Sequence, residues 1–188
     1  MSSKKTSTYK ITLGAAMLAL SVVLPQIFHL TGIPQVGEVF LPMHIPVLLA
    51  GFLTGPWIGA FIGAAAPIIS HFITNMPPSA RLPFMIGELV AYGLVSGLLY
   101  HTADLKSKKG GTIITLIIAM IAGRAVYAAM LLGAAKFFGM ENAGIAAVVT
   151  STVKGVYGIA LQIVIIPPIV YAVKKAGLLD YTKKSKNR

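Results

Sequence analysis

The sequence has 188 residues, of which 56% are hydrophobic and only 11% are charged, too few charges to cover the surface of a water-soluble domain of this length. Although the formal net charge is +11, twelve of the 16 Lys and Arg residues lie at the ends of long apolar blocks, which indicates membrane topology rather than nucleic-acid binding. Cysteine is absent, and its absence excludes disulfides, thiolate metal sites and thiol nucleophiles.

The apolar blocks have lengths that match a bilayer, since about 20 residues of α-helix span about 30 Å of hydrocarbon. They predict an all-α integral membrane protein of about six transmembrane helices. In chain order, the predicted segments are 9–30, 41–53, 57–74, 82–100, 112–138 and 145–173. The second is the shortest, at about 20 Å if helical. Its Pro42 and Pro46 favour an irregular segment that is tilted or partly re-entrant.

Basic residues gather in three places: an N-terminal tail at about 1–8, a loop at 101–111 and a C-terminal tail at 174–188. The number of predicted segments between any two of these places is even, so one side of the membrane can hold all three. Because cytoplasmic segments carry the excess of Lys and Arg, we expect both termini to be cytoplasmic. Residues 1–188 are predicted to form a single transmembrane domain.

Ionisable side chains at membrane depth are costly and therefore usually face a protein interior or a cavity. The deepest ones fall on the last three predicted helices, and each shares a helix face with a tyrosine three or four residues later. These pairs are Glu88 with Tyr92, Arg124 with Tyr127, and Lys154 with Tyr157. One carboxylate facing two cations leaves surplus positive charge, so we expect a ligand pocket that suits an anionic group such as a carboxylate. The alternative is an ion-pair cluster that only holds the helices together.

Two further polar residues lie toward the outer ends of the predicted helices. His44 heads the second segment, and Asn75 follows the third. Both are candidates for the polar lining of an outer cavity, and satisfying a helix end is the competing role. The histidines show no HxxxH or HExxH spacing, so we expect no metal site.

Sequence patterns of catalysis and nucleotide binding are absent: there is no GxSxG, no paired-carboxylate motif for phosphoalcohol transfer and no GxxxxGK[ST]. We therefore expect neither an enzyme nor a cofactor, and no ATP hydrolysis by this chain.

Small residues give a different signal in two of the segments. Ala15 and Ala19 are four apart on the first, and this spacing permits close approach of another helix. Gly59, Gly63 and Pro67 on the third segment have the same property, and we expect them to pack inside the bundle.

Together these features resemble the substrate-binding S components of energy-coupling factor (ECF) vitamin transporters. The resemblance covers most of the chain, including its length, its predicted helices and its basic ends. Ala15-x-x-x-Ala19 is similar to the family's docking motif for its coupling subunit. The other similar stretches are Leu41-Pro42-Met43-His44-Ile45-Pro46-Val47-Leu48-Leu49-Ala50-Gly51-Phe52, Gly55-Pro56-Trp57-Ile58-Gly59, Met76-Pro77-Pro78 and Glu88-Leu89-Val90-Ala91-Tyr92-Gly93.

The resemblance implies capture of a vitamin from outside a prokaryotic plasma membrane, in a pocket formed mainly by helices four to six. It also implies association with a transmembrane coupling subunit and two cytoplasmic ATPases, which drive delivery inward. Pantothenate is the favoured vitamin, from a similar sub-branch and from the surplus cation. A pyridoxine-type vitamin, hydroxymethylpyrimidine and cobalamin are the alternatives. The competing functions are a self-sufficient small carrier or channel, a membrane-embedded enzyme and a purely structural membrane subunit.

Overall fold

The computed structural model describes residues 2–29, 36–140 and 144–178, and within these ranges every regular element is a helix. The helices are α1 (Ser2–His29), α2 (Val36–Phe40), α3 (His44–Thr54), α4 (Pro56–Thr74), α5 (Leu82–Gly97), α6 (Gly111–Phe138), α7 (Ile145–Lys154) and α8 (Val156–Lys175). A π-helical turn, Leu98–Thr102, extends α5, and a short 3-10 turn, Leu105–Ser107, lies before α6. The predicted all-helical fold is confirmed for these ranges.

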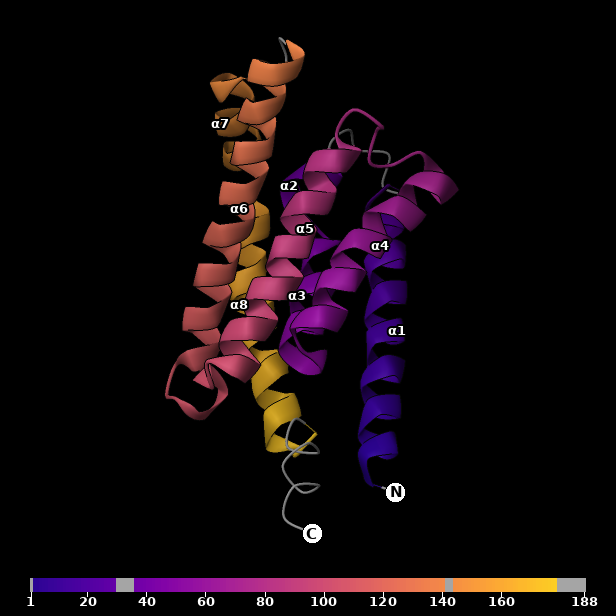
Figure 1. The fold of residues 1–188 in the computed structure, drawn as a ribbon, viewed down its shortest axis with the longest axis vertical. Coiled ribbons are helices and arrows are strands. Elements are labelled where there is room, and N and C mark those ends of the chain that lie inside the picture. The colour runs from indigo at the N-terminus through magenta and orange to yellow at the C-terminus, as the bar shows by residue number, and fades with distance from the viewer. Residues whose placement is uncertain (1, 30–35, 141–143, 179–188) are drawn as a thin grey trace.

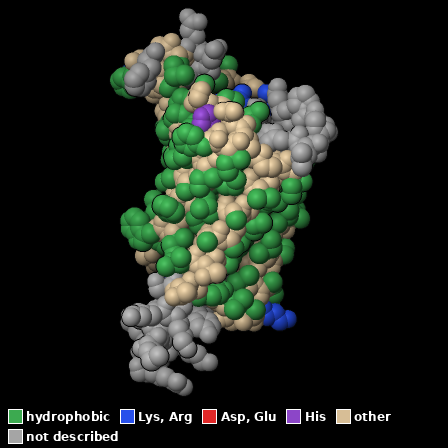
Figure 2. All heavy atoms as spheres, turned by 90° about the vertical axis from the view of Figure 1, so that its right-hand side faces the viewer, with side chains coloured by type: hydrophobic (Ala, Val, Ile, Leu, Met, Phe, Trp, Pro, Cys, Tyr) green, Lys and Arg blue, Asp and Glu red, His purple; other side chains and the backbone are tan. Residues whose placement is uncertain are grey.

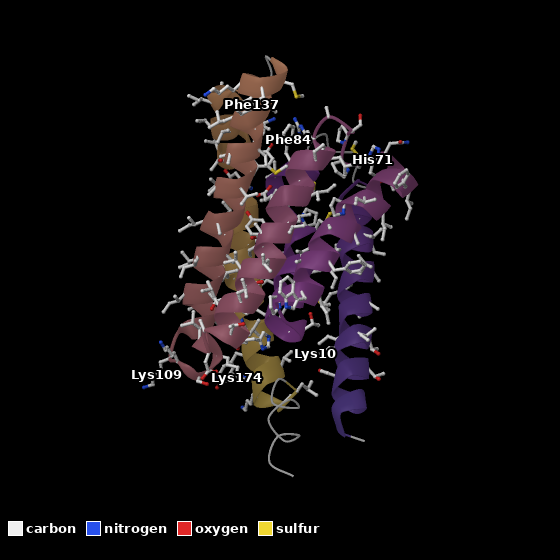
Figure 3. The ribbon with its side chains drawn as sticks, viewed as in Figure 1. Lys10, His71, Phe84, Lys109, Phe137 and Lys174 are labelled. Atoms are coloured by element: carbon white, nitrogen blue, oxygen red, sulfur yellow. The ribbon has the colours of Figure 1, made fainter. Side chains whose placement is uncertain are left out.

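The long helices pack side by side; α1, α4 and α6 run toward one end of the bundle, and α5 and α8 run back (Figure 1). The start of α1, the loop between α5 and α6, and the end of α8 lie at the same end of the bundle, where Figure 3 shows Lys10, Lys109 and Lys174. There the Lys174 ammonium donates a hydrogen bond to the backbone carbonyl of Lys106. The described parts of the three basic segments thus lie at one end, as predicted, and residues 179–188 of the predicted C-terminal tail lie outside the described ranges. We call this end the basic end; its cytoplasmic location remains a prediction.

Within the described residues, five helices are long and apolar enough to cross a membrane. The candidate spans are Thr8–Ile27, Pro56–Thr74, Leu82–Thr102, Gly111–Phe137 and Val156–Lys175. Large apolar side chains point outward from them, such as Trp57 and Phe72 of α4, which are 78% and 82% exposed. Figure 2 shows that the face formed by α1 and α4 is largely hydrophobic between its two ends. These features indicate a multi-pass membrane protein.

The second predicted segment forms α3, a helix of 11 residues in which every residue is buried. Its length is about 16 Å, roughly half the hydrocarbon thickness of a bilayer. A turn precedes it, with Leu41 at φ 49 and the His44 amide bonded to the Leu41 carbonyl at 3.0 Å. Irregular backbone of this kind is tolerated at membrane depth when protein surrounds it. Whether α3 counts as a sixth crossing remains a prediction.

The last predicted segment, 145–173, is not one helix. It divides at Gly155 into α7 and α8. A Cβ atom at Gly155 would lie 2.7 Å from Arg124 Nη2 and 3.2 Å from a Leu41 methyl group, so the chain passes close to both side chains at this point. Glycine is a weak helix former, and the break falls on it.

Glycines also allow α3, α4 and α5 to approach closely. A Cβ atom at Gly59 of α4 would lie 2.6 Å from the Gly93 carbonyl oxygen of α5 and 2.8 Å from the Gly51 Cα of α3. A Cβ at Gly63 would likewise collide with the backbone of α5. The prediction that Gly59 and Gly63 pack inside the bundle is therefore correct.

This packing predicts that Gly59→Ala destabilises the protein by ~1–3 kcal/mol, the usual cost of overpacking. Gly133→Ala on α6 is the matched control, since nothing lies within 4 Å of a Cβ there. The control is expected to be neutral, or stabilising by up to ~1 kcal/mol through helix propensity. Thermal unfolding of the two variants in detergent measures the difference. Equal effects from both substitutions would contradict the close α3–α4–α5 packing.

Candidate functional site

A buried carboxylate joins three helices. Glu88 on α5 is 3% exposed, and its Oε1 accepts a 2.8 Å hydrogen bond from the Tyr92 hydroxyl, one turn along the same helix. Arg124 Nη1 of α6 lies 3.3 Å from the same oxygen. His44 Nε2, at the start of α3, lies 3.7 Å from Glu88 Oε2, and its ring meets that of Tyr92 edge to face at 5.4 Å. We call Glu88, Tyr92, Arg124 and His44 the Glu88 cluster.

Small residues next to the charged ones bring α5 and α6 together. Gly123 precedes Arg124, and a Cβ there would collide with the Tyr92 ring. Gly87 precedes Glu88, and a Cβ there would collide with a methionine side chain of α6. Glu88 and Arg124 are thus each preceded by a glycine, and these glycines allow α5 and α6 to approach each other.

Arg124 uses little of its hydrogen-bonding capacity inside the protein. Its side chain is 15% exposed and its guanidinium carbon lies 5.9 Å from the centre of the Tyr127 ring, which in turn meets Phe84 edge to face at 6.4 Å. Within the described ranges, Nε and Nη2 have no hydrogen-bond partner. A guanidinium has five N–H donors, and here a single nitrogen engages the carboxylate.

Other buried polar atoms also lack a hydrogen-bond partner among the described residues. They include His44 Nδ1 of α3, the Thr115 hydroxyl of α6 and both amide atoms of Gln162 on α8. An unsatisfied polar group in an apolar interior costs roughly 2–7 kcal/mol. Of these atoms, His44 Nδ1 belongs to a residue of the Glu88 cluster, and together with the free guanidinium nitrogens it can engage a ligand that carries an anionic group and a neutral polar group. No group of three or more His, Cys, Asp or Glu side chains in the described ranges is placed to hold a metal ion.

A family model for the substrate-specific component of ECF transporters matches residues 9–170. This range is most of the chain and contains the whole Glu88 cluster. The chain belongs to this family. No curated protein and no solved structure matches it. The protein is thus the substrate-specific membrane component of an ECF transporter, and membership implies a small-molecule substrate and a partnership with a coupling subunit and ATPase subunits.

The structure of this ECF component brings together five of the predicted site residues, namely Glu88, Tyr92, Arg124, Tyr127 and His44. His44 is a neighbour of Glu88 that sequence spacing did not predict, because the two residues meet only through the packing of α3 on α5. Asn75 is not part of this group. It is exposed and has φ 54, and its backbone N–H donates a 2.8 Å hydrogen bond to the His71 carbonyl at the end of α4. Asn75 therefore satisfies a helix end, the competing role named for it above.

The predicted pairing of Lys154 with Tyr157 assumes one unbroken helix, and the structure divides that helix. Lys154 ends α7 and Tyr157 lies on α8, so the break at Gly155 separates them, and Tyr157 is 69% exposed. The ion pairs of Glu88 within the described ranges are with Arg124 and His44. The expected second cation of the cluster is therefore not Lys154, and the capacity for an anion lies in the free donors of Arg124. Ligand contacts by Lys154, Tyr157 and Asn75 remain predictions.

The small residues of α1 face outward in this ECF component. Ala15 and Ala19 are exposed. The neighbouring Gly14 faces the bundle, where a Cβ atom would lie 2.8 Å from the Ile58 side chain of α4. The side of α1 that carries the alanine pair is thus open to another helix.

Sequence reasoning also missed two buried polar side chains that have no hydrogen-bond partner in the described ranges, Gln162 and Thr115. Gln162 does carry a signal, because an amide is rare and costly within an apolar helix of 20 residues. Thr115 carries none, because a helical threonine normally bonds its hydroxyl to the carbonyl one turn earlier. The sequence also gives no indication of the Gly155 contact with Arg124, because that contact depends on how α6 and α8 pack.

Proposed function

We propose that this ECF component captures a small vitamin that carries an anionic group, in a site formed by the Glu88 cluster and Tyr127. The observation that supports the proposal is the buried Arg124 guanidinium, which keeps Nε and Nη2 free of protein partners in the described ranges. A purely structural ion pair favours complete hydrogen bonding, because each unsatisfied buried donor costs stability. A carboxylate ligand satisfies those donors through charge-assisted hydrogen bonds.

Pantothenate is the favoured vitamin, since it combines a carboxylate with an amide and two hydroxyl groups. One of these neutral groups can bond the His44 imidazole, whose Nδ1 has no hydrogen-bond partner among the described residues. A pyridoxine-type vitamin, hydroxymethylpyrimidine and cobalamin remain the alternatives. Each lacks a carboxylate for Arg124.

Titration calorimetry of the purified protein tests the substrate. Pantothenate is expected to bind, and pantothenol, in which a hydroxymethyl group replaces the carboxylate, is expected to bind more weakly. The matched pair isolates the contribution of the anion. Absence of heat with pantothenate, together with saturable binding of one of the other vitamins, would overturn this choice.

We further propose that the basic end is cytoplasmic, so that the Glu88 cluster, which lies away from it, receives the vitamin from outside. Ala15 and Ala19 are proposed to contact a transmembrane coupling subunit, and two cytoplasmic ATPases to supply the energy for delivery. The chain itself is proposed to bind and transport without catalysing a reaction. The exposed alanine pair and the lack of a nucleotide-binding motif support this division of labour.

A further inference from the structure

Three lysines from separate elements meet at the basic end. Lys10 belongs to α1, Lys106 to the 3-10 turn before α6, and Lys174 to the last turn of α8. The Lys174 ammonium donates to the Lys106 carbonyl, and Lys10 is close enough to Lys106 for the two charges to interact. Lys10 and Lys106 are partly buried. The fold therefore brings together three like charges that lie 68 to 164 residues apart in the sequence.

No carboxylate in the described part of the chain neutralises this group. Glu88, which pairs with Arg124 and His44, lies at a distance from the basic end, and Asp104 of the same loop forms no ion pair with the three lysines in the described ranges. Like charges repel one another, and this repulsion is relieved most directly by an anion placed between them. The cluster thus has the electrostatics of an anion site.

The depth of the cluster identifies the source of the anion. The candidate spans begin at Thr8 and end at Thr102 and Lys175, so all three lysines lie within a few residues of a span end. Lipid phosphates occupy the zone just outside the hydrocarbon core. Lysines in this zone extend their ammonium groups toward the headgroups while their alkyl stems stay against apolar surface.

We propose that Lys10, Lys106 and Lys174 bind the phosphate group of an anionic membrane lipid at the basic end. The lipid phosphate bridges the start of α1, the loop before α6 and the end of α8, and so ties together helices that the chain itself connects only at a distance. This lipid site is separate from the Glu88 cluster and does not depend on which vitamin the protein captures.

The test measures lipid binding to the full-length protein in detergent by native mass spectrometry, with phosphatidylglycerol and phosphatidylcholine as probes. The triple variant Lys10→Gln, Lys106→Gln, Lys174→Gln is compared with Lys108→Gln, Lys109→Gln, Lys175→Gln. The second variant removes the same charge from exposed lysines of the same end. Removal of each lysine charge is expected to weaken lipid binding about fivefold. The first variant is therefore expected to lose on the order of a hundredfold in affinity for phosphatidylglycerol.

The control variant is expected to keep most of this affinity, and replacing the same three site lysines by arginine is expected to preserve binding. If the triple Gln variant does not fold, the single change Lys106→Gln, with an expected loss of about fivefold, provides the same comparison. Equal losses in the two triple variants would overturn the site in favour of a diffuse positive field. The site would also be overturned if neither triple variant lost affinity for phosphatidylglycerol, or if phosphatidylcholine bound as tightly as phosphatidylglycerol. Binding of glycerol 3-phosphate as tightly as the lipid would assign the site to a soluble phosphate compound instead.

Discussion

Arg124→Ala is expected to weaken pantothenate binding by ~2–5 kcal/mol, the range found when one partner of a buried, hydrogen-bonded charge pair is lost. This range corresponds to at least about a thirtyfold rise in Kd. The reason is that Arg124 is the buried cation with free donors, Nε and Nη2, in the described site. Titration calorimetry measures the change. Pantothenol is the diagnostic ligand, because the preference for pantothenate over pantothenol is expected to disappear in this variant.

Glu88→Gln is the control that separates ligand recognition from structural ion pairing. It removes the carboxylate charge but leaves the guanidinium, whose Nη1 lies 3.3 Å from Glu88 Oε1, available to an anionic ligand. We expect this variant to retain its preference for pantothenate over pantothenol. Thermal unfolding without ligand reports the cost of breaking the pair in each variant. If Arg124→Ala lowers stability and leaves the preference unchanged, the Glu88 cluster is a structural ion-pair cluster and the proposed site is wrong.

Ala15→Trp is expected to abolish vitamin uptake by the assembled transporter while leaving pantothenate binding to the isolated component unchanged. Ala15 is exposed on the outward side of α1, whereas the neighbouring Gly14 faces the bundle, so an indole at Ala15 points away from the bundle and is expected to leave the ligand site unchanged. It does fill the space that a partner helix needs for close approach to the alanine pair. Uptake into proteoliposomes that contain the coupling and ATPase subunits is the measurement.

Ala125→Trp provides a matched control, because Ala125 is also exposed but lies on α6. We expect this variant to retain uptake. Normal uptake by Ala15→Trp would contradict docking through α1. Uptake by the isolated chain, without ATPase subunits, would instead favour a self-sufficient carrier and contradict the proposed partnership.

Residues close together in the chain account for the part of the site that sequence spacing predicted. Glu88 and Tyr92 are four apart on one helix, so local helical geometry alone places the hydroxyl beside the carboxylate. Arg124 and Tyr127, three apart, also remain neighbours. For Lys154 and Tyr157 the same rule assumes an unbroken helix, and the structure has a break at Gly155 between them. Gly155 also contacts Arg124, and sequence spacing contains no information about this contact.

The sequence by itself determined the solvent and the secondary structure of this protein. Long apolar blocks in a chain with 11% charged residues require lipid around them, and a backbone in lipid must satisfy its hydrogen bonds within helices. Clustered lysines at the block ends also predicted which segments share an end of the bundle. Only the tertiary structure decided that His44 approaches Glu88 and that two guanidinium nitrogens of Arg124 remain free of protein partners in the described ranges. These features depend on how α3, α6 and α8 pack, because side chains from distant segments meet only after the helices associate.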